Sequence, residues 1–192
     1  MRTPAAKQAP PRPVVEDVRP RVDDGRHDAK TVVGDVTEVS ADAFVDGHDL
    51  IRVDVLYRPE GERAWQQASM APLVNDRWRG CFVPDRIGRH EFQVRARVDA
   101  FATWLRDLRA RAGAGQEIGG ELEAGARLAE EAAGRASAEH KQLLVALAGR
   151  IRAGDVPGPA DVEFEELGAL VVRYSGAPAA TSSTYGVWAD RV

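Results

Sequence analysis

The sequence predicts an α+β protein, in which an immunoglobulin-like antiparallel β-sandwich carries an inserted four-helix bundle. About seven short segments with a two-residue hydrophobic period recur at intervals of roughly ten residues, separated by Gly, Pro and Asp, as in β-sandwiches. After Ala102 the composition shifts to Ala, Leu, Glu and Arg, with apolar residues at helical spacing. The last residues alternate again. No Cys-Trp-Cys pattern is present, so a true immunoglobulin domain is not expected.

The β-sandwich is expected over residues 14–100, after a disordered tail. Residues 1–13 contain four prolines and no hydrophobic period, so they bury too little surface to offset their chain entropy. The predicted strands are Val14–Val18, Thr31–Val33, Val36–Val45, Ile51–Tyr57, Ala64–Met70, Arg77–Val83 and Phe92–Val98. Two of these strands are followed by residues that favour turns. Asp46 and Gly47 follow the strand Val36–Val45, and Pro59 and Gly61 follow the strand Ile51–Tyr57.

The inserted helical bundle is expected over residues 101–180. A first helix starts at Phe101, and a second covers Leu122–Ala133. A third runs through Ser137–Ala153, with Ser137 as its N-cap and Leu143, Leu144, Leu147 and Ile151 on its buried face. A fourth lies between Pro159 and Gly176. Residues 181–192 are expected to return to the sandwich as a strand, because Tyr185, Val187 and Ala189 alternate with Gly186 and Trp188.

Charge and composition narrow the range of partners. The chain has 26 basic and 30 acidic residues and a formal net charge of -4, without a basic patch, so neither nucleic acid nor an anionic membrane is expected to bind. The longest apolar run, Leu143–Ala148, is far shorter than a membrane span, and the N-terminus has no apolar signal core. Cys81 is the only cysteine, so an internal disulfide cannot form. These features predict a cytoplasmic protein.

No residue pattern in the chain predicts catalysis, a cofactor or a metal site. The four histidines, His27, His48, His90 and His140, lie far apart and lack ligand spacing, so loop or surface positions explain them better. Adjacent carboxylates such as Glu130 and Glu131 point in different directions on regular structure. Nucleophile-elbow, phosphate-loop and dinucleotide motifs are absent from the sequence. We therefore expect no catalytic, cofactor-binding or metal-binding residue.

Tryptophans are the best candidates for binding or for packing between the two predicted domains. Trp78, Trp104 and Trp188 lie in periodic segments and are interpreted as core residues. Trp65 lies beside the Gly61 turn, so it is the tryptophan whose side chain is expected to be most exposed. It is therefore a candidate glycan contact. The seam, where the predicted sandwich and the predicted bundle pack together, is expected to contain Phe101, Trp104 and Trp188. An Ala-rich bundle buries little area per helix, so self-association is also expected.

Several segments together resemble the N-terminal region of the bacterial α-1,4-glucan:maltose-1-phosphate maltosyltransferases of the α-amylase superfamily. They are VVEDVRPRVDDGRHDAKTVVGDVTEVSADAFVDGHD from Val14, NDRWRGCFVPDRIGRHEFQVRARVDAFATW from Asn75, LEAGARLAEEAA from Leu122 and YGVWADR from Tyr185. The stretch between Gly134 and Gly176 is weakly matched, and Phe101 stands where family members often have proline.

The resemblance implies a β-sandwich with an inserted helical bundle, which together build much of a homodimer interface. It also implies maltosyl transfer from α-maltose 1-phosphate to an α-1,4-glucan, by an aspartate nucleophile and a glutamate acid/base on a (β/α)₈ barrel. Because that barrel would follow Arg191, no catalytic residue is transferred to this sequence. The chain is thus expected to be an accessory and dimerisation module, as a fragment or as a short related reading frame. The alternatives are a free-standing glycan-binding sandwich and an inert remnant of a split gene.

Overall fold

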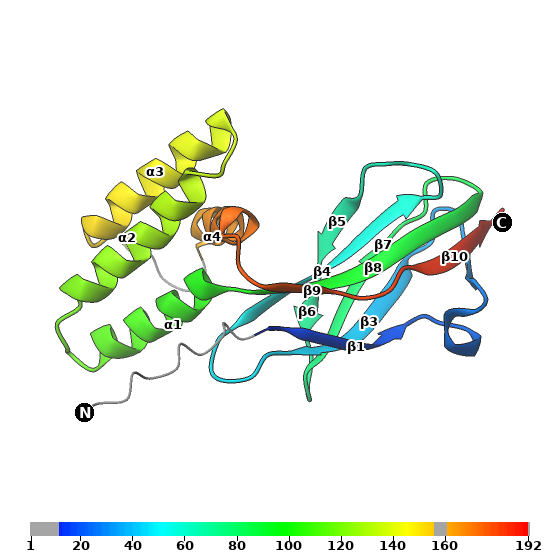
Figure 1. Ribbon diagram of the computed structural model, residues 1–192, viewed down its shortest axis with the longest axis horizontal. Coiled ribbons are helices and arrows are strands. Elements are labelled where there is room, and N and C mark those ends of the chain that lie inside the picture. Colours follow the sequence, from blue (N-terminus) through cyan, green and yellow to red (C-terminus); the bar gives the residue numbers. More distant parts are fainter. Residues whose placement is uncertain (1–11, 156–160, 192) are drawn as a thin grey trace, which may run out of the picture. The chain divides into compact units, whose positions relative to one another are not determined.

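The computed structural model describes residues 12–155 and 161–191, which form ten β-strands, four α-helices and one 3₁₀ helix (Figure 1). The strands are β1 (Val14–Arg19), β2 (Ala29–Val32), β3 (Thr37–Phe44), β4 (Ile51–Pro59), β5 (Gln66–Ser69), β6 (Ala71–Pro72), β7 (Arg77–Phe82), β8 (Gly88–Val98), β9 (Ala179–Thr181) and β10 (Tyr185–Asp190). The helices are α1 (Ala100–Gly113), α2 (Gly119–Ala133), α3 (Ala138–Arg152) and α4 (Val162–Tyr174), and the 3₁₀ helix is η1 (Asp23–Gly25). The protein is therefore mixed α+β, as predicted.

Three parts of the sequence-based prediction fall outside the described residues. They are the tail up to residue 11, Pro159 near the predicted start of the fourth helix, and Val192 at the end of the predicted returning strand. The described residues divide into two compact units. The β unit contains residues 12–47, 51–97 and 178–191, and the helical unit contains residues 48–50, 98–155 and 161–177. The helical residues thus lie between β8 and β9 along the chain.

The β unit contains two sheets. One has the strand order β1-β3-β7-β6; the other has six strands, in the order β2-β10-β8-β4-β5 with β9 also paired to β8 (Figure 1). The prediction of wholly antiparallel pairing is wrong at one place, because β10 pairs with β2 in parallel and with β8 antiparallel. These two strands are separated by most of the chain rather than joined by a hairpin, so no tight turn forces them to run in opposite directions.

Both sheets contribute to one apolar core. Alternate residues of β8 from His90 to Val98 are buried, and Val39, Ala41 and Ala43 of β3 are almost fully buried as well. This is the two-residue period that the sequence shows. The interpretation of all four histidines as loop or surface residues is wrong for His90, which is 2% exposed. Cys81, on β7, is an exposed free thiol.

The switch from strand to helix after Val98 has a local cause. Asp99 is the N-cap of α1, and its side chain accepts a hydrogen bond of 2.7 Å from the backbone N–H of Ala102. This bond satisfies one of the N–H groups that the first turn of a helix leaves without a partner. A second hydrogen bond joins the start of α1 to the loop before β4, because Thr103 Oγ1 accepts a 2.8 Å hydrogen bond from the N–H of Leu50.

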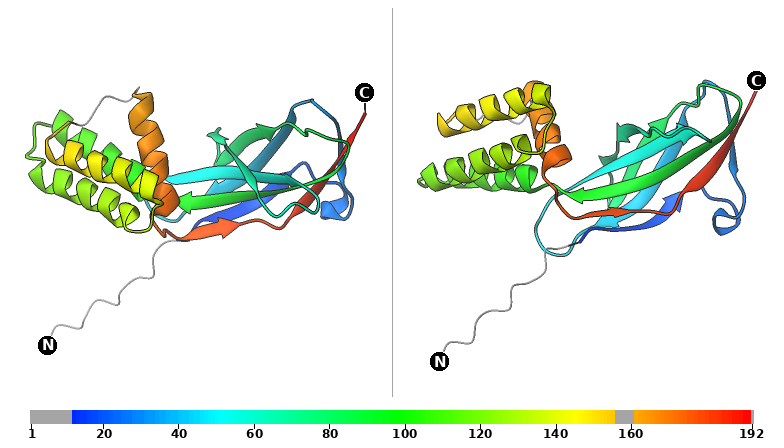
Figure 2. Two further views of the ribbon diagram at one scale, coloured as in Figure 1. Left: turned by 90° about the horizontal axis from the view of Figure 1, so that it is seen from above. Right: turned by 45° about the horizontal axis from the view of Figure 1, so that its top comes forward.

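The four helices of the helical unit pack around a second apolar core. Its buried residues come from every helix and include Leu105, Ala129, Leu147 and Phe164. Figures 1 and 2 show α1, α2 and α3 side by side, with α4 running across them. Ser137 caps α3 as predicted, by accepting a hydrogen bond from the N–H of His140. None of the helices in the described part of the chain has the length and apolar character needed to cross a membrane.

A charged cluster joins the surfaces of α2 and α3. Arg152 of α3 donates to Glu123 at 2.8 Å and to Glu130 at 2.6 Å, and Arg127 donates to Glu123 as well. Hydrogen bonds from Arg152, then from Arg127, lower the pKa of Glu123 from 4.5 to about 2. A carboxyl group with a lowered pKa favours folding above its unfolded pKa, and this contribution is lost as the pH falls toward 2.

An Arg152→Gln variant is expected to raise the pKa of Glu123 well above 2, because the largest contribution to the lowered pKa is removed. Arg127 remains, so the pKa should stay below its ordinary value. The measurement is an NMR titration of the glutamate side-chain carboxyl carbons between pH 2 and 7. Arg135→Gln is the control, because Arg135 donates to backbone carbonyls of Glu131, Tyr174 and Ser175. An unchanged Glu123 pKa in the Arg152 variant would show that Arg152 does not hydrogen-bond to Glu123 as described.

Candidate functional site

The face of the six-stranded sheet that points away from the β core carries a dense polar surface. Along β8, Phe92 and Val94 are buried in the core, so the alternating residues Arg89 and Glu91 point to the opposite side. The same alternation places residues of β2, β4 and β10 beside them. We call the part of this surface around Arg89 the outer sheet face; it consists of Asp28, Lys30, Arg58, Glu60, Arg89, Glu91, Gly186, Trp188 and Asp190.

Arg89 lies at the centre of the ion pairs on this face. Its Nε donates to Asp28 at 2.9 Å, and its Nη1 donates to Glu60 at 2.9 Å and to Glu91 at 3.4 Å. The Asp28 carboxylate, followed by Glu60, raises the pKa of the Arg89 guanidinium above its ordinary value. Glu91 also accepts a 2.8 Å hydrogen bond from Arg58. The side chains are thus held in fixed positions by one another rather than by solvent.

Gly186 allows two of these side chains to cross β10. A Cβ at this position would overlap with the carboxylate of Asp28 and would lie 2.7 Å from Nη2 of Arg89. Gly186 pairs with Glu91 of β8, directly beneath the Arg89–Asp28 ion pair. A glycine inside a strand often marks such a close approach of another group to the backbone. The sequence contained this signal, but it did not indicate which side chains approach.

Trp188 is the large apolar residue of the outer sheet face. It is 42% exposed, and its Nε1 donates a 2.9 Å hydrogen bond to Asp190 Oδ1. Its neighbours Val187 and Ala189 are the buried residues of β10. The interpretation of Trp188 as a core residue is therefore wrong, because the strand period turns it to the other side. Its role in packing between the two units stays a prediction.

Trp65 lies just before β5 and is half-buried. The guanidinium carbon of Arg58 lies 4.1 Å from the centre of its ring, which is a cation–π contact. Arg58 also reaches Glu91, so Trp65 is joined to the outer sheet face. One face of the indole ring is thus occupied by a residue of the chain itself, and its role as a glycan contact stays a prediction.

Phe101 and Trp104 lie together in the core of the helical unit. Their ring centres are 5.0 Å apart, and they are 3% and 9% exposed. The indole Nε1 of Trp104 donates a 2.6 Å hydrogen bond to the carbonyl oxygen of Glu121 in α2. Both aromatic residues therefore stabilise the contacts among the helices, and their predicted role at the seam stays a prediction.

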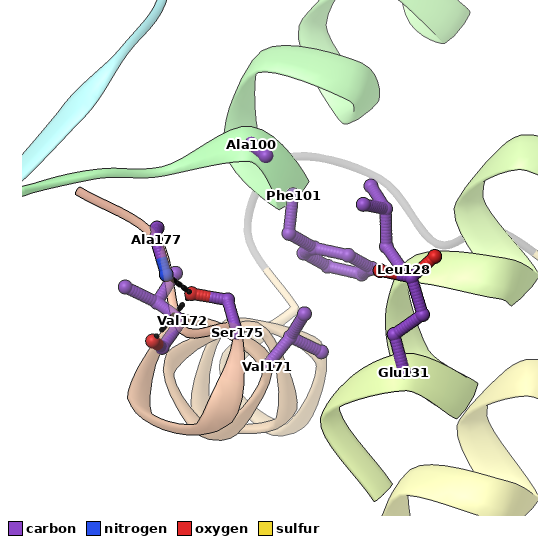
Figure 3. Close-up of a pocket in the computed structure, with 8 residues that line it drawn as sticks. All are labelled: Ala100, Phe101, Leu128, Glu131, Val171, Val172, Ser175 and Ala177. Atoms are coloured by element: carbon purple, nitrogen blue, oxygen red, sulfur yellow. Dashed lines mark hydrogen bonds between the residues drawn. The ribbon is translucent and has the colours of Figure 1, made fainter. Parts of the chain in front are cut away.

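A cavity of about 220 Å³ opens beside Phe101 in the helical unit (Figure 3). Its lining residues are Ala100, Phe101, Leu128, Glu131, Val171, Val172, Ser175 and Ala177. The Ser175 hydroxyl donates to the carbonyl of Val172 at 3.0 Å and accepts from the N–H of Ala177 at 3.1 Å. Glu131 is the one carboxylate among the lining residues, whereas glycoside chemistry needs two carboxyl groups at a fixed separation.

The part of the chain that the structure describes contains no group of three or more His, Cys, Asp or Glu side chains arranged to hold a metal ion. The strongest assembly of polar and aromatic groups described above is the outer sheet face, which contains ion pairs and an exposed indole. Such a surface can bind, orient or dock a partner.

Comparisons with known proteins agree with the segments singled out in the sequence. The family model for alpha-1,4-glucan:maltose-1-phosphate maltosyltransferase, domain N/S, matches residues 11–191. The enzyme of that name from Chlorobaculum tepidum is 36% identical over 155 residues, which are 81% of this chain and 23% of the relative. The one from Salinibacter ruber is 34% identical over 183 residues, 93% of this chain and 27% of the relative.

The relative from Myxococcus xanthus is 40% identical over 126 residues, which are 64% of this chain and 19% of that enzyme. The chain thus spans about a quarter or less of the length of the relatives from Chlorobaculum and Myxococcus, and little more of the one from Salinibacter. The match to one named domain, over a range that contains all of the described residues, decides the assignment. The chain belongs to the α-1,4-glucan:maltose-1-phosphate maltosyltransferase family and corresponds to its N-terminal N/S region.

Proposed function

We propose that the chain is the accessory and dimerisation module of an α-1,4-glucan:maltose-1-phosphate maltosyltransferase, and that it supports maltosyl transfer without performing it. The match of residues 11–191 to domain N/S carries this proposal. The packing of the two units also supports the accessory role, because each unit is a packed scaffold with its own apolar core. In this view the chemistry belongs to a barrel domain in the same polypeptide as the module.

The proposal includes the finer architecture. The two sheets form an immunoglobulin-like sandwich, and the four helices form a bundle inserted into it between β8 and β9 along the chain. Two facts support this architecture: both sheets share one core, and the four helices lie between β8 and β9 along the chain. A cytoplasmic location completes this proposal and accords with a single, exposed cysteine.

A second copy of the chain is the first partner in this proposal. The described surface of the helical unit includes Leu143 and Val145 on α3 and Val162 on α4, which are 45%, 52% and 70% exposed. Exposed aliphatic side chains on a small helical unit are the residues that a symmetric dimer would cover. An α-1,4-glucan is the second partner, because the relatives are named for that polymer.

The purified chain is expected to form a dimer and to release no phosphate from α-maltose 1-phosphate in the presence of a glucan acceptor. Light scattering coupled to gel filtration, at several protein concentrations, measures the mass, and a phosphate assay measures turnover. A full-length member of the family is the positive control for the assay. A monomer at every concentration would contradict the dimerisation role, and turnover by the chain alone would contradict the accessory role.

A further inference from the structure

The outer sheet face presents an immobilised aromatic ring to solvent. Trp188 is 42% exposed, and the hydrogen bond from its Nε1 to Asp190 fixes the ring. A ring that is already held in place loses little conformational entropy when a ligand stacks on it. Flat apolar ligand surfaces, such as the C–H face of a pyranose ring, pack on an exposed indole.

The charges around this ring are nearly balanced. The outer sheet face contains three cations, Lys30, Arg58 and Arg89, and four carboxylates, Asp28, Glu60, Glu91 and Asp190. Most of them are paired with one another, at 2.8 to 3.4 Å for the arginines. A phosphate-rich ligand gains little from such a surface. A neutral polyhydroxylated ligand fits it, because planar carboxylate and guanidinium groups in fixed positions bond to pairs of adjacent hydroxyl groups.

The paired groups also form a continuous row across the sheet. Arg58 of β4 contacts Glu91 of β8, and Arg89 of β8 contacts Asp28 over Gly186 of β10. With strands about 4.8 Å apart, the row from β4 to the segment beside β2 extends roughly 14 Å. This length accommodates a short run of sugar units rather than a single sugar.

We propose that the outer sheet face binds an α-1,4-glucan chain, with Trp188 as the stacking residue and the ion-pair row centred on Arg89 as its hydrogen-bonding surface. The choice of glucan rests on the proposed function, because the polymer is taken from the name of the family. A protein partner is the competing occupant, since Trp and Arg are also common at protein interfaces. Burying ion pairs that are already satisfied would give such a partner little net affinity, so the glucan is favoured.

Native gel electrophoresis of the intact chain, with and without glycogen in the gel, tests this proposal. The chain should be retarded by glycogen, and Trp188→Ala should abolish the retardation. Calorimetric titration with maltoheptaose should show at least a tenfold weaker affinity for Trp188→Ala and near-parental affinity for Trp188→Phe, which keeps an aromatic ring. Dextran, an α-1,6-glucan, should give no retardation. Circular dichroism and the thermal midpoint confirm that each variant is folded.

Two further variants separate the contributions on the face. Gly186→Ala keeps Trp188 but displaces Asp28 and Arg89, and should weaken maltoheptaose binding several-fold. Trp65→Ala should have a smaller effect than Trp188→Ala, because Arg58 already covers one face of its ring. Leu143→Ala, in the helical unit, is the control that should leave glucan binding unchanged.

The proposal is overturned if the parent chain is not retarded by glycogen, whatever its oligomeric state. It is also overturned if Trp188→Ala leaves glucan binding unchanged and instead lowers the mass measured by light scattering, since the face would then be an interface between copies. The proposed accessory function has its own tests, mass and turnover, so the failure of either proposal can be recognised separately.

Discussion

A Gly125→Ala variant is expected to lower the free energy of unfolding of the helical unit by about 1 to 3 kcal/mol, as overpacking of a close-packed core usually does. Gly125 lies in α2, where a Cβ would overlap with the indole ring of Trp104. The ring has little room to move. Its Nε1 is bonded to the carbonyl of Glu121 at 2.6 Å, and Phe101 lies 5.0 Å away between ring centres.

Gly149→Ala is the matched control. Gly149 lies in α3, is exposed, and no atom lies within 4 Å of a Cβ built there. Alanine is favoured over glycine inside a helix, so this variant should be stabilised by roughly 0.5 to 1 kcal/mol. The measurement is urea unfolding followed by circular dichroism at 222 nm. Stabilisation by both substitutions would show that Trp104 does not pack on Gly125 as described.

The sequence predicted the position and type of most elements because their signals are local. The alternation from Phe92 to Val98 depends only on the strand period, and the observed burial follows it residue by residue. The N-cap of α3 depends on Ser137 and the N–H of His140, three residues apart. The short strand β9 was missed, because three residues, Ala179–Thr181, are too few to show a period.

The outer sheet face could not be predicted as a unit, because its contacts join distant residues. Arg89 and Asp28 are 61 positions apart, and nothing in the local sequence pairs them. The alternation in β10 did contain enough information to place Trp188. Val187 and Ala189 flank it, and an apolar residue on each side of a strand residue indicates that the residue itself faces away from the core. Its large apolar side chain suggested burial, and the strand period overrode that preference.

The sequence-based prediction that Leu143 of α3 is buried is wrong. The sequence placed Leu143 and Leu144 on one buried face, but adjacent residues of a helix point about 100° apart. Leu144 is fully buried, whereas Leu143 is 45% exposed. Leu144→Ala is therefore expected to lower the free energy of unfolding by about 2 to 5 kcal/mol. Leu143→Ala should change this free energy by less than about 1 kcal/mol.

The two variants remove the same atoms from neighbouring positions of α3, so helix propensity cancels in their comparison. Urea unfolding at low protein concentration gives both free energies. If α3 lies in a dimer interface, Leu143→Ala will become more destabilising as the protein concentration rises, whereas the cost of Leu144→Ala, which acts within the unit, will increase less. Equal costs at low concentration would mean that α3 is rotated about its axis relative to the arrangement described, and that its packed face is not the one formed by Leu144, Leu147 and Ile151.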